Sequence, residues 1–273
     1  MLAISALCCI LSLSSPDVHL TLEQQIAVLE EAQHAYDRAI RLQTADPVAS
    51  KESFRRASNR YQILVDDGIE NGKLWYDLGN AQLQSGEIGE AIAAYRSAQR
   101  FMPSNGRLVT NLEYARSLVT NPMRWEGSTS ILKRLAFWHD TVPTEIRLAV
   151  GIVFWVGCWT LVVTRFFILI PGFKTVTITL GLATLALGVS VGADFANQHQ
   201  RNGVLTAKEV IVRKGNSLQD APMFQDPIQE GVEFDILGVR SGWLHIRLQN
   251  GREGWIQQDD AQVVSIDDFV SLG

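Results

Sequence analysis

The residue types that perform enzymatic chemistry are present in this sequence, but not at the spacing that a catalytic site requires. Three acidic pairs, Asp66–Asp67, Asp259–Asp260 and Asp267–Asp268, could serve general acid and base catalysis if they converged in a pocket. Adjacency in the chain does not produce convergence, and solvation at the surface explains the pairs better. No nucleophile is paired with a base, and no glycine-rich loop has the pattern of a phosphate cradle. We therefore expect a protein that is not an enzyme and uses no cofactor.

Histidine and cysteine, the usual ligands of zinc, are too scattered to suggest a metal site. The five histidines are His19, His34, His139, His199 and His245. Cys8 and Cys9 lie in an apolar leader and Cys158 lies in a central apolar block, so neither a zinc site nor a disulfide framework is expected. The net charge of −5 gives no basic surface of the kind that a phosphate backbone needs. Nucleic acid is therefore not an expected partner.

The chain begins with an uncharged apolar stretch, Met1 to Leu13, which is followed by the small residues Ser14 and Ser15. This pattern predicts a secretory signal peptide at residues 1–14. The basic residues that normally begin such a leader are missing, because the first basic residue is Arg38. An exposed hydrophobic tail is the alternative interpretation.

Two long apolar segments lie in the middle of the chain. A run of 17 uncharged residues follows Arg147, and a run of 19 follows Lys174. About 20 apolar residues span the hydrocarbon core of a bilayer, so we expect transmembrane helices at residues 146–170 and 175–193. A buried hairpin in a soluble core is the alternative. Two spans would return the chain to the side of the membrane on which it began.

The charges in the sequence do not by themselves show on which side of the membrane the modules before and after the hairpin lie. Basic residues flank both apolar segments on both ends, so the positive-inside rule does not decide the orientation. The signal-like leader favours export. We therefore expect a multi-pass protein of a bacterial inner membrane, with residues 122–145 as a linker and the modules before and after the hairpin on the periplasmic side.

Residues 20–121 carry apolar side chains at helical spacing, and the segment from Gly72 to Asn105 resembles a tetratricopeptide repeat. Seven residues of that repeat fall in register within 34 positions: Trp75, Leu78, Gly79, Ala91, Tyr95, Ala98 and Pro103. One repeat cannot bury its own apolar face, so neighbouring helices are required. We expect a degenerate preceding repeat from Leu22 to Leu42 and Lys51 to Val65, and a closing helix from Asn105 to Val119. The resemblance implies an α-solenoid of two to three repeats.

The same resemblance suggests where a partner would bind. Gly79 and Ala91 are expected where the two helices of the repeat approach closely, and Trp75 and Tyr95 are expected to fill the space between them. Such solenoids bind an extended peptide or a helix on a concave face that comes from the first helix of each repeat. Tyr76, Asn80 and Tyr114 are the candidate partner-binding residues on that face. Packing or solvent exposure without a ligand is the alternative for each of them.

Residues 203–265 change to short segments of strand-like alternation separated by Gly and Asn, which predicts a small antiparallel barrel. Four short motifs resemble those of bacterial SH3-like domains: Val212 to Gly215, Glu230-Gly231, Gly242 to Ile246 and Gly251 to Ile256. Trp243 and Trp255 have two interpretations. They either fill the core or rim of the barrel, or form partly exposed platforms for a peptide or a glycan.

The order of leader, helical repeats, apolar hairpin and SH3-like module resembles that of the BatE-like family in the Bacteroides aerotolerance group. The resemblance implies partners that are membrane-anchored proteins with von Willebrand factor A domains. The expected fold is a multidomain membrane protein with an α-solenoid, a two-helix transmembrane hairpin and a small all-β SH3-like barrel.

Two functions are compatible with this organisation. In the first, the chain is a non-catalytic scaffold whose repeats capture partner proteins beside the lipid bilayer, in a complex of the aerotolerance or envelope-stress type. In the second, it is an envelope protein whose SH3-like module binds peptidoglycan.

Overall fold

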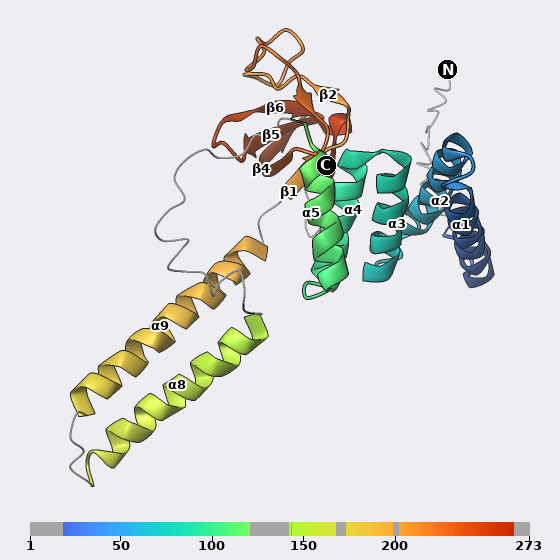
Figure 1. Cartoon of the computed structure of the whole chain (residues 1–273). Helices are drawn as coiled ribbons and strands as arrows, with labels where there is room; N and C mark the ends of the chain where they lie inside the picture. The colour runs from blue at the N-terminus through green and yellow to red at the C-terminus, as the bar shows by residue number, and fades with distance from the viewer. Residues whose placement is uncertain (1–18, 121–141, 143, 168–172, 199–201, 265–273) are drawn as a thin grey trace, which may run out of the picture. The chain divides into compact units, whose positions relative to one another are not determined.

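The computed structural model describes residues 19–120, 142, 144–167, 173–198 and 202–264, and Figure 1 shows their helices and strands. The predicted leader at residues 1–14 and most of the predicted linker at 122–145 lie outside the described residues. The chain divides into two compact units, residues 1–70 and residues 71–273, which are described separately.

The first unit consists of two helices, α1 (Leu22–Leu42) and α2 (Pro47–Asp66), which pack against each other. Thr21 begins α1 with a capping box, in which its side chain accepts from the Gln24 N–H and the Gln24 side chain accepts from the Thr21 N–H. Pro47, at the first turn, suits the start of α2 because its missing N–H would have no helical partner there. The α1 bounds agree with the sequence prediction, whereas α2 begins four residues before the predicted Lys51.

Asp67, directly after α2, is a structural residue and not a solvated one, so that sequence prediction is wrong. Its side chain is only 7% exposed and accepts hydrogen bonds from the Leu20 N–H at 2.7 Å and from Gln25 Nε2 at 2.8 Å. The Leu20 N–H, followed by the Gln25 amide, holds the pKa of the Asp67 carboxyl below its usual value. The end of α2 is thereby joined to the start of α1.

The second unit begins with three helices, α3 (Gly72–Ser85), α4 (Ile88–Phe101) and α5 (Gly106–Leu118). α4 packs against both neighbours, and its contact with α3 is the more extensive. The centre of this layer is fully buried and contains Leu78, Ala91 and Tyr95. Gly79 lies directly against the Tyr95 ring, since a Cβ added there would meet Tyr95 Cδ1 at 2.7 Å. The predicted close approach at Gly79 is confirmed.

The two apolar segments form helices α8 (Thr144–Thr164) and α9 (Phe173–Gln198), which pack against each other. Both are long and apolar enough to cross a membrane, over Ile146–Thr164 and Phe173–Gly192. The first helix is shorter than the predicted 146–170. Its hydrogen bonds tighten to i→i+3 after Thr164, as from the Phe166 N–H to Val163 O at 3.1 Å, and residues 168–172 lie outside the described part.

Large apolar side chains of α8 and α9 point away from the helix pair. Trp155 and Trp159, one turn apart on α8, are both more than half exposed and stack edge to face. One charged side chain does lie between the helices, because Arg147 is buried and donates to Ser190 Oγ on α9. Burying a charged group is costly unless its donors are hydrogen-bonded, and this bond satisfies one donor of Arg147 from the facing helix.

The carboxyl-terminal strands, which we call the β module (residues 202–264), form an open antiparallel sheet with the strand order β6-β5-β4-β1-β7. The five strands are β1 (Asn202–Leu205), β4 (Glu233–Arg240), β5 (Trp243–Leu248), β6 (Glu253–Gln257) and β7 (Ala261–Val263). A separate pair is formed by β2 (Glu209–Val210) and β3 (Ile228–Gln229), and the 3-10 turn η1 (Gln258–Asp260) precedes β7. Among the described residues no ladder joins the edge strands β6 and β7, so the closed barrel of the sequence prediction is not shown.

We predict that Gly79→Leu destabilises the α3–α4 pair, because the new side chain would overlap the Tyr95 ring and overpacking costs about 1–3 kcal/mol. Thermal unfolding of the full chain in detergent, followed by circular dichroism, measures the effect. The control is Gly106→Leu, since nothing lies within 4 Å of a Cβ added at Gly106. Equal melting temperatures for the two variants would contradict the close contact.

Candidate functional site

Two of the three partner-binding residues predicted on the helical repeats lie in one hydrogen-bonded cluster. Asn80 Oδ1 accepts from Tyr95 Oη at 2.8 Å and from Asn111 Nδ2 at 2.9 Å. The same Asn111 Nδ2 donates to Tyr76 Oη at 3.1 Å, and the Tyr76 and Tyr95 rings lie 6.0 Å apart. We call Tyr76, Asn80 and Asn111 the α3/α5 polar cluster. Its hydrogen bonds join α3 to α5 and also satisfy the buried hydroxyl of Tyr95 on α4.

The members of the α3/α5 polar cluster are half-buried, so each leaves part of its side chain to solvent. Asn80 also has an internal role, because it satisfies the hydroxyl of the fully buried Tyr95. An unsatisfied buried hydroxyl costs about 1–3 kcal/mol, so a change at Asn80 would affect both stability and any ligand. Tyr76 is the better probe of binding.

Tyr114, the third predicted residue, lies outside the hydrogen-bonded cluster but on the same helix as Asn111, three residues further along. Tyr114 is 57% exposed, more than the other exposed large hydrophobic residues of α3, α4 and α5, Phe101 at 41% and Leu118 at 40%. Residues three apart on a helix are neighbours on its surface. Tyr114 therefore extends the surface that the α3/α5 polar cluster begins.

A second group of aromatic residues lies on the outer face of β5 and β6. The alternation of burial along β5 places Leu244 and Ile246 inside and leaves Trp243 and His245 half-exposed. His245 is paired across the ladder with Trp255, and the two rings stack at 4.7 Å with an angle of 15°. The two tryptophans are thus half-exposed, which fits both a rim position and an exposed platform, and Trp255 stacks on His245.

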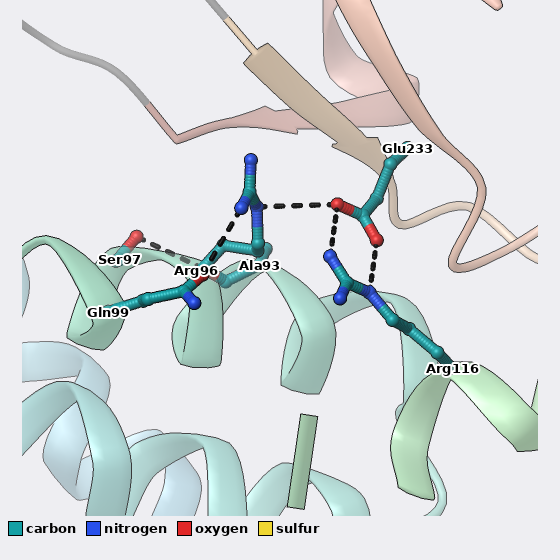
Figure 2. A network of polar contacts seen from close by, with 6 residues as sticks. All are labelled: Ala93, Arg96, Ser97, Gln99, Arg116 and Glu233. Carbon is teal, nitrogen blue, oxygen red and sulfur yellow. Dashed lines mark hydrogen bonds and ion pairs between the residues drawn. The ribbon is translucent and has the colours of Figure 1, made fainter. Parts of the chain in front are cut away.

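One carboxylate of the β module contacts two helices of the helix layer, as Figure 2 shows. Glu233, the first residue of β4, receives two hydrogen bonds from Arg116 of α5, from Nε at 2.6 Å and from Nη2 at 2.9 Å. Arg96 of α4 approaches the same carboxylate with its Nε at 3.3 Å. The Glu233 side chain is only 14% exposed, whereas Arg96 and Arg116 are 27% and 34% exposed, so the carboxylate is more shielded from water than its two partners.

Next to Glu233, the backbone at Gly231 lies in close contact with the helix layer. Gly231 has a φ of +83° and its N–H donates to Leu205 O at 2.7 Å. A Cβ added at Gly231 would lie 2.6 Å from Val119 Cγ2 and 3.1 Å from Ile92 Cδ1 of the helix layer. Only glycine suits both the left-handed backbone and the small space. We call the contact of Glu230, Gly231 and Glu233 with α4 and α5 the helix–sheet junction.

The junction also caps a helix. The N-cap residue of α4, Glu87, makes no side-chain capping bond, and the Gly89 N–H donates instead to Glu230 Oε2 at 3.1 Å. A carboxylate is favourable there because the amino end of a helix carries a partial positive charge. The neighbouring Glu90 is mostly buried, and burial, followed by the charges of Glu230 and Glu87, raises the pKa of its carboxyl.

The described residues contain no group of three His, Cys, Asp or Glu side chains that could hold a metal ion. Asp259 and Asp260 lie in η1, where burial, followed by the charge of Asp259, raises the pKa of the Asp260 carboxyl. The backbone carbonyl of Asp260 accepts from the Thr206 and Ala207 N–H groups. The pair Asp267–Asp268 lies outside the described residues.

We predict that Glu233→Gln destabilises the helix–sheet junction by about 1–3 kcal/mol, because two arginines would lose their counter-charge in a half-buried position. Chemical unfolding of the full chain in detergent measures the loss. Glu253→Gln is the matched control, since the Glu253–Arg247 pair is exposed and such pairs contribute about 0–1 kcal/mol. The junction is not a stabilising contact if both variants unfold alike.

Comparisons of the chain with protein-family models, with curated proteins and with solved structures found no match. A proposal for the function must therefore come from the residues and their geometry.

Proposed function

We propose that this chain is a membrane-anchored, non-catalytic scaffold that captures partner proteins on its helical repeats, beside a bacterial inner membrane. The observation that carries the proposal is the surface formed by the α3/α5 polar cluster and Tyr114. It combines half-buried polar groups with an exposed aromatic side chain, and tyrosine is enriched among the residues that dominate protein interfaces.

The pairing of α3 with α4 supports a tetratricopeptide-like repeat. Gly79 and Tyr95 make the close contact that such a repeat needs, and α5 covers α4 in the position of a closing helix. The β module has the strand content of a small SH3-like fold, although its sheet is open. We infer a short α-solenoid with an SH3-like module packed against it.

The membrane anchor in this proposal is the pair α8 and α9. Both helices have the length and apolarity of a span, and their large side chains face outward, where lipid would cover them. The helix–sheet junction supports a hairpin, because the segments before α8 and after α9 touch each other and must share one side of the membrane. The signal-like leader favours the periplasmic side.

Membrane-anchored proteins with von Willebrand factor A domains are the partners that the resemblance to the BatE-like family suggests. An anchor in the same bilayer would raise the effective concentration of scaffold and partner, so a modest interface would suffice.

A second function is favoured by one observation on the β module. Trp255 is half-exposed and oriented by its stack with His245, and Trp243 lies on the same outer face. Aromatic faces of this kind can stack on a sugar ring or a peptide. We keep peptidoglycan binding through the β module as the alternative.

The topology leads to one prediction. Single cysteines at Ser104 and Gln249, in a chain whose native cysteines are replaced by Ala, should react equally with a membrane-impermeant maleimide in intact cells. Both positions are exposed, one before and one after the two helices. Opposite reactivity of the two cysteines would mean that only one of the helices spans the membrane.

The surface formed by the α3/α5 polar cluster and Tyr114, which we call the capture surface, leads to a second prediction. Tyr76→Ala and Tyr114→Ala together should reduce crosslinked partner recovered from native membranes by at least about tenfold, as expected for interface tyrosines. The helical content should stay the same, and Glu113→Ala, an exposed neighbour on α5, is the control. If capture survives the tyrosine changes and is lost in Trp255→Ala, the peptidoglycan alternative replaces the scaffold.

A further inference from the structure

Helix α1 exposes an apolar stripe that the first unit does not cover. Its members follow one face of the helix at intervals of four, three, four and seven residues: Leu22, Ile26, Leu29, Gln33 and Ile40. Leu22 is 72% exposed, Ile26 and Ile40 are each 49% exposed, and Leu29 is 37% exposed. We call these residues the α1 stripe. The side of α1 that packs on α2 is a different one, marked by the buried Ala32 and Ala39.

The spacing of the α1 stripe is that of a helix-to-helix seam. Positions three and four apart form a ridge from Leu22 to Gln33 that fits between the side chains of a second helix, and Ile40 lies on the same face two turns further along. From Leu22 to Ile40 the stripe covers 18 steps of 1.5 Å, or about 27 Å. That length matches a partner helix of about five turns. Gln33, near the middle, offers one polar group to fix its register.

The border of the α1 stripe on its solvent side is acidic. Glu23, Glu30 and Asp37 follow this border at intervals of seven residues, and all three are exposed. None of them forms an ion pair with a described residue, in contrast to Glu31, which pairs with Arg60. Arg41 ends the border, so three carboxylates and one guanidinium leave it with a net charge of −2.

This charge decides which helix fits. A second copy of α1, packed antiparallel on the stripe, would bring an equally acidic border with it and would set Glu30 against Glu30. A helix with Lys or Arg along its own border would instead pair with all three carboxylates.

We propose that the α1 stripe is a docking site for an amphipathic helix of a partner protein that carries aliphatic residues at heptad spacing and basic residues along one border. The apolar side chains provide the affinity, and the acidic border selects the charge of the partner. This site lies on the first unit, so it does not depend on the α3/α5 polar cluster or Tyr114.

The probe for this site is a pair of synthetic 21-residue helical peptides with the same Leu and Ile seam, one with Lys and one with Glu on the border. Fluorescence anisotropy with the full chain in zwitterionic nanodiscs, corrected with empty nanodiscs, should show that the Lys peptide binds more tightly. The double substitution Ile26→Gln and Leu29→Gln should weaken binding of the Lys peptide by at least about tenfold, because two aliphatic contacts that the peptide would bury are lost.

The acidic border of the α1 stripe is tested by reversing its charge. Glu30→Lys with Asp37→Lys should reverse the preference so that the Glu peptide binds more tightly, and the reversal should fade at high salt. Glu113→Lys, an exposed carboxylate on α5, is the control and should change neither affinity. Tyr114→Ala should also leave peptide binding unchanged, which separates failure of this site from failure of the capture surface.

Two results would overturn the proposal. One is that the variant with Glu30→Lys and Asp37→Lys still binds the Lys peptide more tightly than the Glu peptide. The other is read from a photocrosslinker placed at Ile26 in cells. We expect an adduct with a basic amphipathic helix of another protein. An adduct with residues 1–18 of the same chain, or with a second copy of α1, means that the stripe has a different occupant.

Discussion

The carboxylate of Glu233 is the point on which the second unit depends. It begins β4, the strand that pairs with both β1 and β5, and it accepts from arginines on two different helices. A bidentate arginine fixes direction as well as distance, because both N–H groups must align with both oxygens. Since the β4 backbone is held in the sheet, this side chain ties the sheet to both α4 and α5.

That charge pair could not form the junction alone. Removing charges from water is costly, and much of the attraction between them only offsets this cost. The favourable part comes from the contacts around it, where Gly231 lets the backbone approach Ile92 and Val119, and where Glu230 caps the start of α4. The same geometry has a local cost at Glu90, whose carboxyl is buried near Glu230 and has a raised pKa. Charge therefore specifies the arrangement, and apolar contact stabilises it.

Sequence reasoning was reliable where a pattern is local or repeats at a fixed interval. The bounds of α1, the close helix approach at Gly79 and the two apolar helices all follow from residues close together in the chain. Glu233 and Arg116 are 117 positions apart, and Asp67 and Leu20 are 47 apart, so no spacing rule connects them. Asn111 was missed for the same reason, because its partners Tyr76 and Asn80 lie on another helix. The open sheet was missed because strand patterns give pairing but not closure.

The junction also determines which parts of the β module remain available. The helices contact β1, β7 and the turn before β4, which lie toward one end of the sheet order. Trp243 and Trp255 lie on β5 and β6, at the other end, so the junction and the aromatic face do not compete for the same residues. The aromatic face of β5 and β6 and the surface of Tyr76 and Tyr114 therefore lie on different elements of the second unit, and neither takes part in the junction.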